Sequence, residues 1–163
     1  MARQEVATLA GGCFWGVEEL IRKMPGVIGT TVGYAGGEMA NPRYEDVKTG
    51  RTGHAETVEI VFDPDRIGYE EILRFFFRFH DPTTKNRQGN DVGTQYRSSI
   101  FYHDDAQRET AKRVVKEVDE SGKWSRPIVT EVVPAPKFWP AEDYHQDYLQ
   151  RIPHGYNCHY VRE

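Results

Sequence analysis

The sequence has little that would place it in a membrane or on a nucleic acid. No apolar run approaches the length of about 20 residues that spans a bilayer, and residues 1–6 lack the basic-then-apolar pattern of a secretion signal. Lys and Arg total 21 against 25 Asp and Glu, a formal charge of -4, so no broad basic field attracts nucleic acid or anionic lipid. We therefore expect a cytoplasmic protein with neither a membrane nor a nucleic-acid partner.

Cysteine is also scarce, because Cys13 and Cys158 are the only two. Two cysteines cannot build a disulfide framework, and in a reducing compartment they more often stay thiols or take part in catalysis. Cys13 lies in the sequence GCFWG at 12–16, and Cys158 lies in GYNCH at 155–159. One glycine-flanked cysteine near each end of the chain is an arrangement that can carry redox chemistry.

The length of 163 residues fits one compact domain, and no repeat, low-complexity segment or linker divides the chain. We expect a single catalytic domain over 1–163, with 153–163 as a mobile C-terminal coil tail. Long polar loops are expected at 35–53 and 81–97. Apolar patterning predicts strands at 6–10, 27–34, 56–62, 98–102 and 128–133, and helices at 17–23, 69–79, 104–120 and 143–149. Their uneven alternation predicts an α/β fold of α+β character, a layered sandwich with a central mixed sheet flanked by helices.

Cys13 is the candidate nucleophile. A cysteine attacks as the thiolate, so its pKa must be lowered or its proton removed. Cys13 follows a predicted strand and precedes a predicted helix, whose N-terminal N–H groups can stabilise the negative charge. The alternative is a buried structural thiol, the commoner fate of such a cysteine. The flanking glycines, which suggest an exposed turn, favour the reactive interpretation.

Phe14 and Trp15 follow the candidate nucleophile directly. One aromatic near a strand end usually fills the core, but adjacent side chains of an extended segment diverge. We therefore expect at least one of the two to line a surface pocket. An aromatic wall beside a thiolate suits a small apolar group such as a methyl or thioether.

Four polar residues could supply protons or hydrogen bonds to such a site. Glu56 starts a predicted strand, where a solvated carboxylate is the simpler interpretation; burial beside aromatics would instead raise its pKa and let it protonate a leaving oxygen. The phenols of Tyr44 and Tyr96 can donate to an oxygen without carrying charge. Asp91 lies in the same loop as Tyr96, in ordinary turn-forming composition.

Cys158 is the candidate second thiol. An oxidised Cys13 would need a thiol with which to condense, and a flexible tail can deliver one. His154 and His159 flank Cys158, so a metal site is the alternative. The His-x3-Cys-His pattern with one remote cysteine does not match a compact zinc spacing, and we expect no metal.

Four segments together resemble the methionine sulfoxide reductase A family. They are GCFWG at 12–16, GHAE at 53–56, QGNDVGTQYRS at 88–98 and AEDYHQ at 141–146. They run in the expected order from near the N-terminus almost to the C-terminus, and the four together are very specific. The resemblance implies a layered α/β domain with a mixed sheet. It also implies reduction of the S epimer of methionine sulfoxide, free or in proteins.

The resemblance also implies a role for each candidate residue of the substrate site. Cys13 would attack the sulfoxide sulfur, and Phe14 and Trp15 would hold the S-methyl group. The remaining roles fall to the polar group: Glu56, with Tyr44 and Tyr96, would bind and protonate the sulfoxide oxygen so that it leaves as water, and Asp91 would organise the hydrogen-bond network.

For recycling, the resemblance implies that Cys13 is left as a sulfenic acid. Cys158 would condense with it to a disulfide, which thioredoxin would reduce by thiol–disulfide exchange. No metal, flavin or nucleotide cofactor is implied, and the enzyme would act as a monomer.

Two other functions use the same residues. A thiol peroxidase or peroxide sensor would form the same Cys13–Cys158 disulfide. A domain that only binds exposed methionine-containing segments would use the aromatic pocket and would not need the Cys13 thiol.

Overall fold

The computed structural model describes residues 3–157 and 159–162. The main sheet has six strands in the order β7-β6-β1-β3-β2-β8, and β4 and β5 form a separate two-stranded ribbon. The strands are β1 (Glu5–Gly11), β2 (Val27–Ala35), β3 (Ala55–Phe62), β4 (Arg87–Gln88), β5 (Asp91–Val92), β6 (Ser98–Tyr102), β7 (Glu131–Pro134) and β8 (Trp139–Pro140). The α-helices are α1 (Phe14–Arg22), α2 (Tyr44–Val47), α3 (Tyr69–Phe79), α4 (Asp105–Glu120) and α5 (Tyr148–Arg151), and the 3-10 turns are η1 (Thr94–Tyr96) and η2 (Asp143–His145).

The main sheet is mixed, which confirms the predicted fold class. The pairs β1–β3, β1–β6, β2–β3 and β2–β8 are antiparallel, whereas β6 and β7 run parallel. The β2–β3 pair sets the site, because its register places Val32 opposite Val58 and Tyr34 opposite Glu56. Residues of a strand two apart share a face, so Glu56 points to the same side as Val58 and Ile60.

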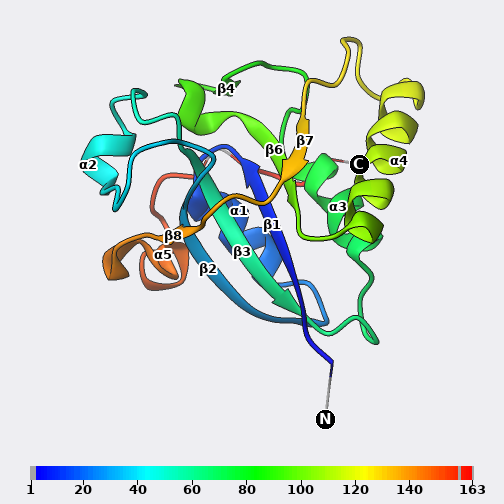
Figure 1. The fold of residues 1–163 in the computed structure, drawn as a ribbon, viewed down its shortest axis with the longest axis horizontal. Coiled ribbons are helices and arrows are strands. Elements are labelled where there is room, and N and C mark those ends of the chain that lie inside the picture. The colour runs from blue at the N-terminus through cyan, green and yellow to red at the C-terminus, as the bar shows by residue number, and fades with distance from the viewer. Residues whose placement is uncertain (1–2, 158, 163) are drawn as a thin grey trace.

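That side of the sheet carries the main core. Val58 and Ile60 are fully buried there, with Phe14 and Ile21 from α1 and Phe76 from α3. The opposite side has a smaller cluster in which Ala10, Ala35, Ala55 and Phe101 pack under the segment that follows β7. Figure 1 shows this orange segment crossing in front of the sheet from β7 to β8, with α1 behind it. Glu56 thus lies on the helix-covered side, where burial is deepest.

The predicted elements are present, with several differences. The strand predicted over 128–133 begins only at Glu131, and β8 was not predicted. Helix α1 begins at Phe14, not 17, so Cys13 is its N-cap residue. The predicted loops contain short elements, namely α2 in 35–53 and β4, β5 and η1 in 81–97. The predicted helix over 143–149 is divided into η2 and α5, because Asp147 between them has a left-handed backbone with φ 55°. Local propensity does not specify such breaks, since tertiary packing decides them.

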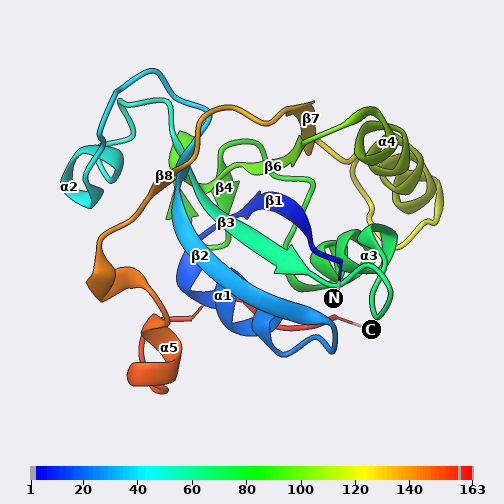
Figure 2. The same cartoon turned by 60° about the horizontal axis from the view of Figure 1, so that its bottom comes forward.

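The described part of the C-terminal tail is coil and turn after α5, as predicted. In Figure 2 the red tail leaves α5, passes α1 and ends beside α3. At α3 the Arg162 N–H donates to the Arg78 carbonyl at 2.6 Å, and the Arg78 Nε donates to the Arg162 carbonyl at 3.0 Å. The mobility expected for this tail stays a prediction.

Within the described ranges, no helix is long and apolar enough to cross a bilayer.

Candidate active site

Cys13 lies at the tight turn between β1 and α1. Gly12 has φ +99°, and a Cβ there would lie 2.7 Å from the Gln88 side chain, so the turn requires glycine. The Cys13 side chain is 7% exposed, and both Gly12 and Gly16 are buried. The expectation that the flanking glycines mark an exposed turn is therefore wrong, because they serve close packing. The N-cap position of Cys13 still favours the thiolate, since the N-terminal end of a helix carries partial positive charge.

Glu56, from β3, contacts the same end of α1. Its carboxylate accepts the backbone N–H of Phe14 at 3.1 Å, and its side chain is 2% exposed. Burial raises the pKa of Glu56 to about 8, against the opposing effect of the Phe14 hydrogen bond; the charge of Asp91 raises it further. The simpler interpretation of a solvated strand-end carboxylate is thus wrong, and Glu56 holds a proton at neutral pH.

Tyr44 and Tyr96 are half-buried beside this pair. Burial raises the pKa of Tyr44 to about 12, with further contributions from the charges of Glu56, Cys13 and Asp91. Burial and the same charges also raise the pKa of Tyr96. Both phenols therefore stay protonated and can donate hydrogen bonds. These electrostatic contributions indicate that Cys13, Tyr44, Glu56, Asp91 and Tyr96 lie in one site.

Side chains tie together the two loops that carry these phenols. Thr94 and Gln95, next to Tyr96, donate to the carbonyls of Gly50 at 3.2 Å and Lys48 at 3.2 Å, which follow the helix that starts at Tyr44. The buried His54 closes the base of the same loop, because its Nδ1 accepts from Gly37 N–H at 3.0 Å and its Nε2 contacts the Met39 carbonyl at 2.7 Å. Long-range hydrogen bonds therefore convert two polar loops into walls of the site.

Glu142 is a supporting residue whose role the sequence did not predict. Its carboxylate accepts the Tyr44 backbone N–H at 2.9 Å and the Tyr34 hydroxyl at 2.8 Å. Burial works against the charge of Glu142, but these hydrogen bonds outweigh it and lower its pKa. Glu142 thus stays ionised and fixes the start of α2, where Tyr44 lies.

His145 is a second such residue, and it holds Trp15. The Trp15 Nε1 donates to the His145 Nδ1 at 3.0 Å, and the Trp15 ring stacks on Tyr148 with centroids 3.9 Å apart. The His145 ring also lies 4.4 Å from the Tyr44 ring and 5.3 Å from the Phe14 ring. Burial lowers the pKa of His145, so it is neutral, with its proton on Nε2. Both Glu142 and His145 lie in the AEDYHQ segment at 141–146, so the family resemblance of that segment could have indicated them.

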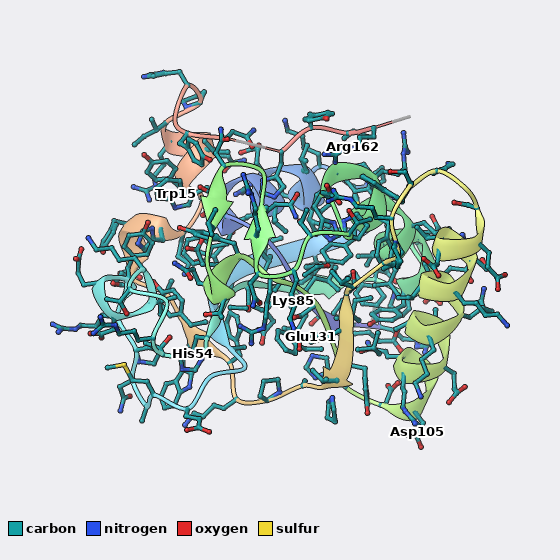
Figure 3. All side chains as sticks on the ribbon, turned by 90° about the horizontal axis from the view of Figure 1, so that it is seen from above. Trp15, His54, Lys85, Asp105, Glu131 and Arg162 are labelled. Carbon is teal, nitrogen blue, oxygen red and sulfur yellow. The ribbon has the colours of Figure 1, made fainter. Side chains whose placement is uncertain are left out.

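The two aromatics beside Cys13 have different environments. Phe14 is fully buried and packs against Tyr34 at 5.8 Å between ring centroids, whereas Trp15 is half-buried. Both belong to the first turn of α1, so their divergence comes from the helix and not from the extended segment that we expected. Figure 3 shows Trp15 beside α5, at the end of the molecule where the red tail begins.

Asp91 completes the polar side and contacts the tail. Its carboxylate accepts the Tyr156 hydroxyl at 3.0 Å. The next candidate along the tail, Cys158, lies outside the described residues, as does any metal site that would include it. Across residues 3–157 and 159–162, no cluster of three His, Cys, Asp or Glu side chains could hold a metal ion.

The arrangement combines a thiol at a helix N-terminus, a protonated carboxyl group, two neutral phenols and an aromatic wall. The thiol can attack an electrophilic sulfur, and the three neutral donors can bind an oxygen and supply its proton. The aromatic wall suits the apolar group on that sulfur.

Comparison with known proteins agrees with this chemistry. The family model described as peptide methionine sulfoxide reductase matches residues 5–163. The peptide methionine sulfoxide reductase MsrA of Mycolicibacterium vanbaalenii is 57% identical over 162 residues, which cover 99% of this chain and 94% of that protein.

Solved structures show the same fold. Mxr1 from Saccharomyces cerevisiae in reduced form aligns with a TM-score of 0.93 at 42% identity, over 99% of this chain and 93% of that chain. Mxr1 in complex with Trx2 aligns with a TM-score of 0.68 at 30% identity, over 99% of this chain and 91% of that chain.

The buried acid generates a prediction about stability. Because the folded-state pKa of Glu56 lies near 8, above the ordinary 4.5, the folded state binds the proton more tightly and loses stability as the pH rises through that range. Replacing Glu56 with Gln removes this dependence. We expect the free energy of unfolding of Glu56→Gln, relative to the unmodified protein, to increase between pH 5 and pH 9 by on the order of 3 kcal/mol.

Urea unfolding at each pH measures the difference in the free energy of unfolding between the variant and the unmodified protein. Glu109→Gln, at an exposed helix position with a side chain 73% exposed, is the matched control and should show a flat difference. A flat difference for Glu56→Gln as well would mean that Glu56 is ionised in the folded state at neutral pH.

Proposed function

This chain belongs to the peptide methionine sulfoxide reductase family, and we propose that it reduces the S epimer of methionine sulfoxide, free or in proteins, to methionine. The observation that carries the proposal is the placement of Cys13 and Glu56 at one helix end, a nucleophile beside a protonated acid. All groups proposed for the site come from one chain, so a monomer suffices. A reducing compartment such as the cytoplasm would keep the thiols and the reductant reduced.

In the first step the Cys13 thiolate attacks the sulfoxide sulfur. The sulfoxide sulfur gains two electrons and the Cys13 sulfur loses two. The net change converts one thiol and one sulfoxide into a sulfenic acid and a thioether, so that methionine leaves. The helix N-terminus favours the attacking charge, and Glu56 binds the N–H of Phe14, the residue next to Cys13, so that both groups can reach one substrate sulfoxide.

The sulfoxide oxygen takes two protons and leaves as water, one from Glu56 and one that the Cys13 thiol gives up when it becomes the thiolate. A second water then displaces methionine from the Cys13–methionine sulfonium adduct, which forms the sulfenic acid and returns a proton to Glu56. A carboxylic acid with a pKa of about 8 is a donor at neutral pH, and removal of a positioned general acid typically costs about 10²–10⁴ in rate. Tyr44 and Tyr96 bind the same oxygen as neutral donors, and Asp91 organises the network.

Phe14 and Trp15 hold the S-methyl group. A methyl on sulfur has no hydrogen-bonding capacity, so its recognition relies on apolar contact and shape. The bond from Trp15 to His145 and the stack on Tyr148 would keep the indole in one orientation for this purpose.

Cys158 resolves the sulfenic acid, and thioredoxin then reduces the disulfide. Condensation joins the two sulfurs, and the sulfenic hydroxyl leaves with the thiol proton as water. The match to Mxr1 in complex with Trx2 supports thioredoxin as the reductant.

Turnover of the separated epimers tests the function. With dithiothreitol as reductant, the protein should release methionine from the S epimer and not from the R epimer, and Cys13→Ser should release none, because the attacking atom is gone. Chiral chromatography of the products measures both. Peroxide consumption without sulfoxide reduction would favour the peroxidase alternative, and full binding of oxidised peptides by Cys13→Ser without turnover would favour the binding domain.

The pH dependence tests the role of Glu56. Because the protonated form is the donor, the rate of methionine release in a single turnover should fall about tenfold per pH unit above about pH 8. Glu56→Gln should be slower by about 10²–10⁴ and should lack this alkaline limb. Rapid-quench measurements from pH 6 to pH 10 give the pH profile of methionine release. If the rate of Glu56→Gln still falls above pH 8, a group other than Glu56 causes that fall.

Replacement of the second cysteine tests recycling. Cys158→Ser should release one methionine per enzyme at the normal rate and then stop when thioredoxin is the reductant, because the sulfenic acid has no partner thiol. Quench-flow with thioredoxin, and separately with dithiothreitol, distinguishes the steps. Sustained thioredoxin-driven turnover by this variant contradicts the resolving role.

A further inference from the structure

The second histidine of the tail, His159, is buried although Tyr156 and Tyr160 are exposed. Its side chain is 7% exposed, whereas Tyr156 and Tyr160 are 45% and 61% exposed. The His159 Nε2 lies 2.7 Å from the Gly11 carbonyl. A carbonyl only accepts, so Nε2 carries the proton and donates it. The edge of the Phe79 ring closes the other side, with centroids 6.0 Å apart.

Gly16 of α1 makes room for this contact. A Cβ at Gly16 would lie 2.4 Å from the His159 Nδ1 and 2.5 Å from the Asn157 Oδ1, closer than real side chains approach. The same Asn157 Oδ1 accepts the His159 backbone N–H at 2.9 Å. Glycine is a poor helix former, so its presence in the first turns of α1 has a specific reason, the close approach of Asn157 and His159.

The contact joins the tail to the turn that carries the nucleophile. Gly11 is two residues before Cys13, and Gly16 is three residues after it. Two further contacts hold the tail on either side, from Tyr156 to Asp91 and between Arg162 and Arg78. Figure 3 shows Arg162 at the far end of the red tail from Trp15, so the tail passes across α1 between these points.

We propose that His159 is a positioning residue for the resolution step, anchoring the tail to the Gly11–Gly16 turn. The inference rests on the function proposed above, in which Cys158 is the resolving thiol. In the chain, Cys158 is bonded directly to Asn157 and His159, the two residues that Gly16 accommodates. The packing of Asn157 against Gly16 and the contact of His159 with Gly11 thus lie on the two sides of the resolving residue in the sequence.

The anchor acts on the second step and not on the first. Condensation forms the Cys13–Cys158 bond and releases water, and its rate depends on the effective concentration of the second thiol near the first. Attack on the sulfoxide uses Cys13, Glu56 and the tyrosines, none of which contacts His159 through a hydrogen bond between described residues. Loss of the anchor therefore separates the two rates.

Substitution of His159 tests this separation. His159→Ala should slow disulfide formation at least about tenfold, as expected when a reacting group loses its positioning, with methionine release in the first turnover unchanged within about twofold. His159→Gln, whose amide N–H can also donate to the Gly11 carbonyl, should recover part of the rate. His154→Gln, at an exposed position of the same tail, is the matched control and should behave as the unmodified protein.

A second variant approaches the contact from the helix. Gly16→Ala places a methyl group against Asn157 and His159 and favours the helix by propensity, so slow disulfide formation in a folded Gly16→Ala protein would come from displacement of the tail. Circular dichroism confirms folding of each variant. Dimedone trapping of the sulfenic acid and loss of reactive thiol give the rate of the second step.

Generating the sulfenic acid with hydrogen peroxide, as well as with methionine sulfoxide, separates the two proposals. If the unmodified protein fails to reduce the sulfoxide, the proposed function fails. The rates of disulfide formation in the unmodified protein and in His159→Ala can still be compared after oxidation with hydrogen peroxide. If Cys158→Ser still closes a normal cycle with thioredoxin, the resolving role of Cys158 and the positioning role of His159 both fail, while sulfoxide reduction by Cys13 stands. If disulfide formation in His159→Ala matches the unmodified protein, or if both steps slow equally, the positioning role is overturned while the proposed function stands.

Discussion

The carboxyl group of Glu56 and the thiol of Cys13 both lie at the N-terminal end of α1, and the rest of the site depends on this placement. The exposed N–H groups at a helix N-terminus favour negative charge on any group they meet. For Cys13 this is what a nucleophile needs. For Glu56 the same effect would remove the proton, yet burial on the helix-covered side of the sheet outweighs the Phe14 hydrogen bond and leaves a pKa of about 8. One helix end can therefore hold a protonated acid beside the thiol, because burial outweighs the effect of the helix end at Glu56.

The fold buries the Glu56 carboxyl group through strand alternation. Glu56 is on the same side of β3 as Val58 and Ile60, and it pairs with the buried Tyr34 of the neighbouring strand β2. The carboxyl group therefore lies in the main core, at the end of a strand, under the first turn of α1. Glu56 keeps its proton because the sheet places it where a carboxylate is least stable.

The two phenols illustrate how loops become part of such a site. Tyr44 lies at the start of a four-residue helix, which could not persist alone. Glu142 accepts its backbone N–H, and the hydrogen bonds from Thr94 and Gln95 join the next loop to it. The C-terminal tail is attached in the same manner, through Gly11, Asp91 and Arg78. Long-range polar contacts, and not local propensity, therefore shape the edge of the site.

The longer strands and helices, the mixed sheet and the residue types of the chemistry could be predicted from the amino-acid sequence. Each of these rests on a pattern within a short segment: the periodicity of 56–62 and 69–79, the glycine turn before Cys13, and motifs whose order resembles one family. The start of α1 at Phe14, the break at Asp147 and the burial of Gly16 could not be predicted in this way, because each is set by a contact with a distant residue. Only the tertiary structure decided that Glu56 is buried under α1, that Glu142 and His145 hold Tyr44 and Trp15, and that His159 docks on Gly11. The physical reason is that a pKa, a hydrogen bond between elements and the room for a side chain all depend on neighbours far away in the chain.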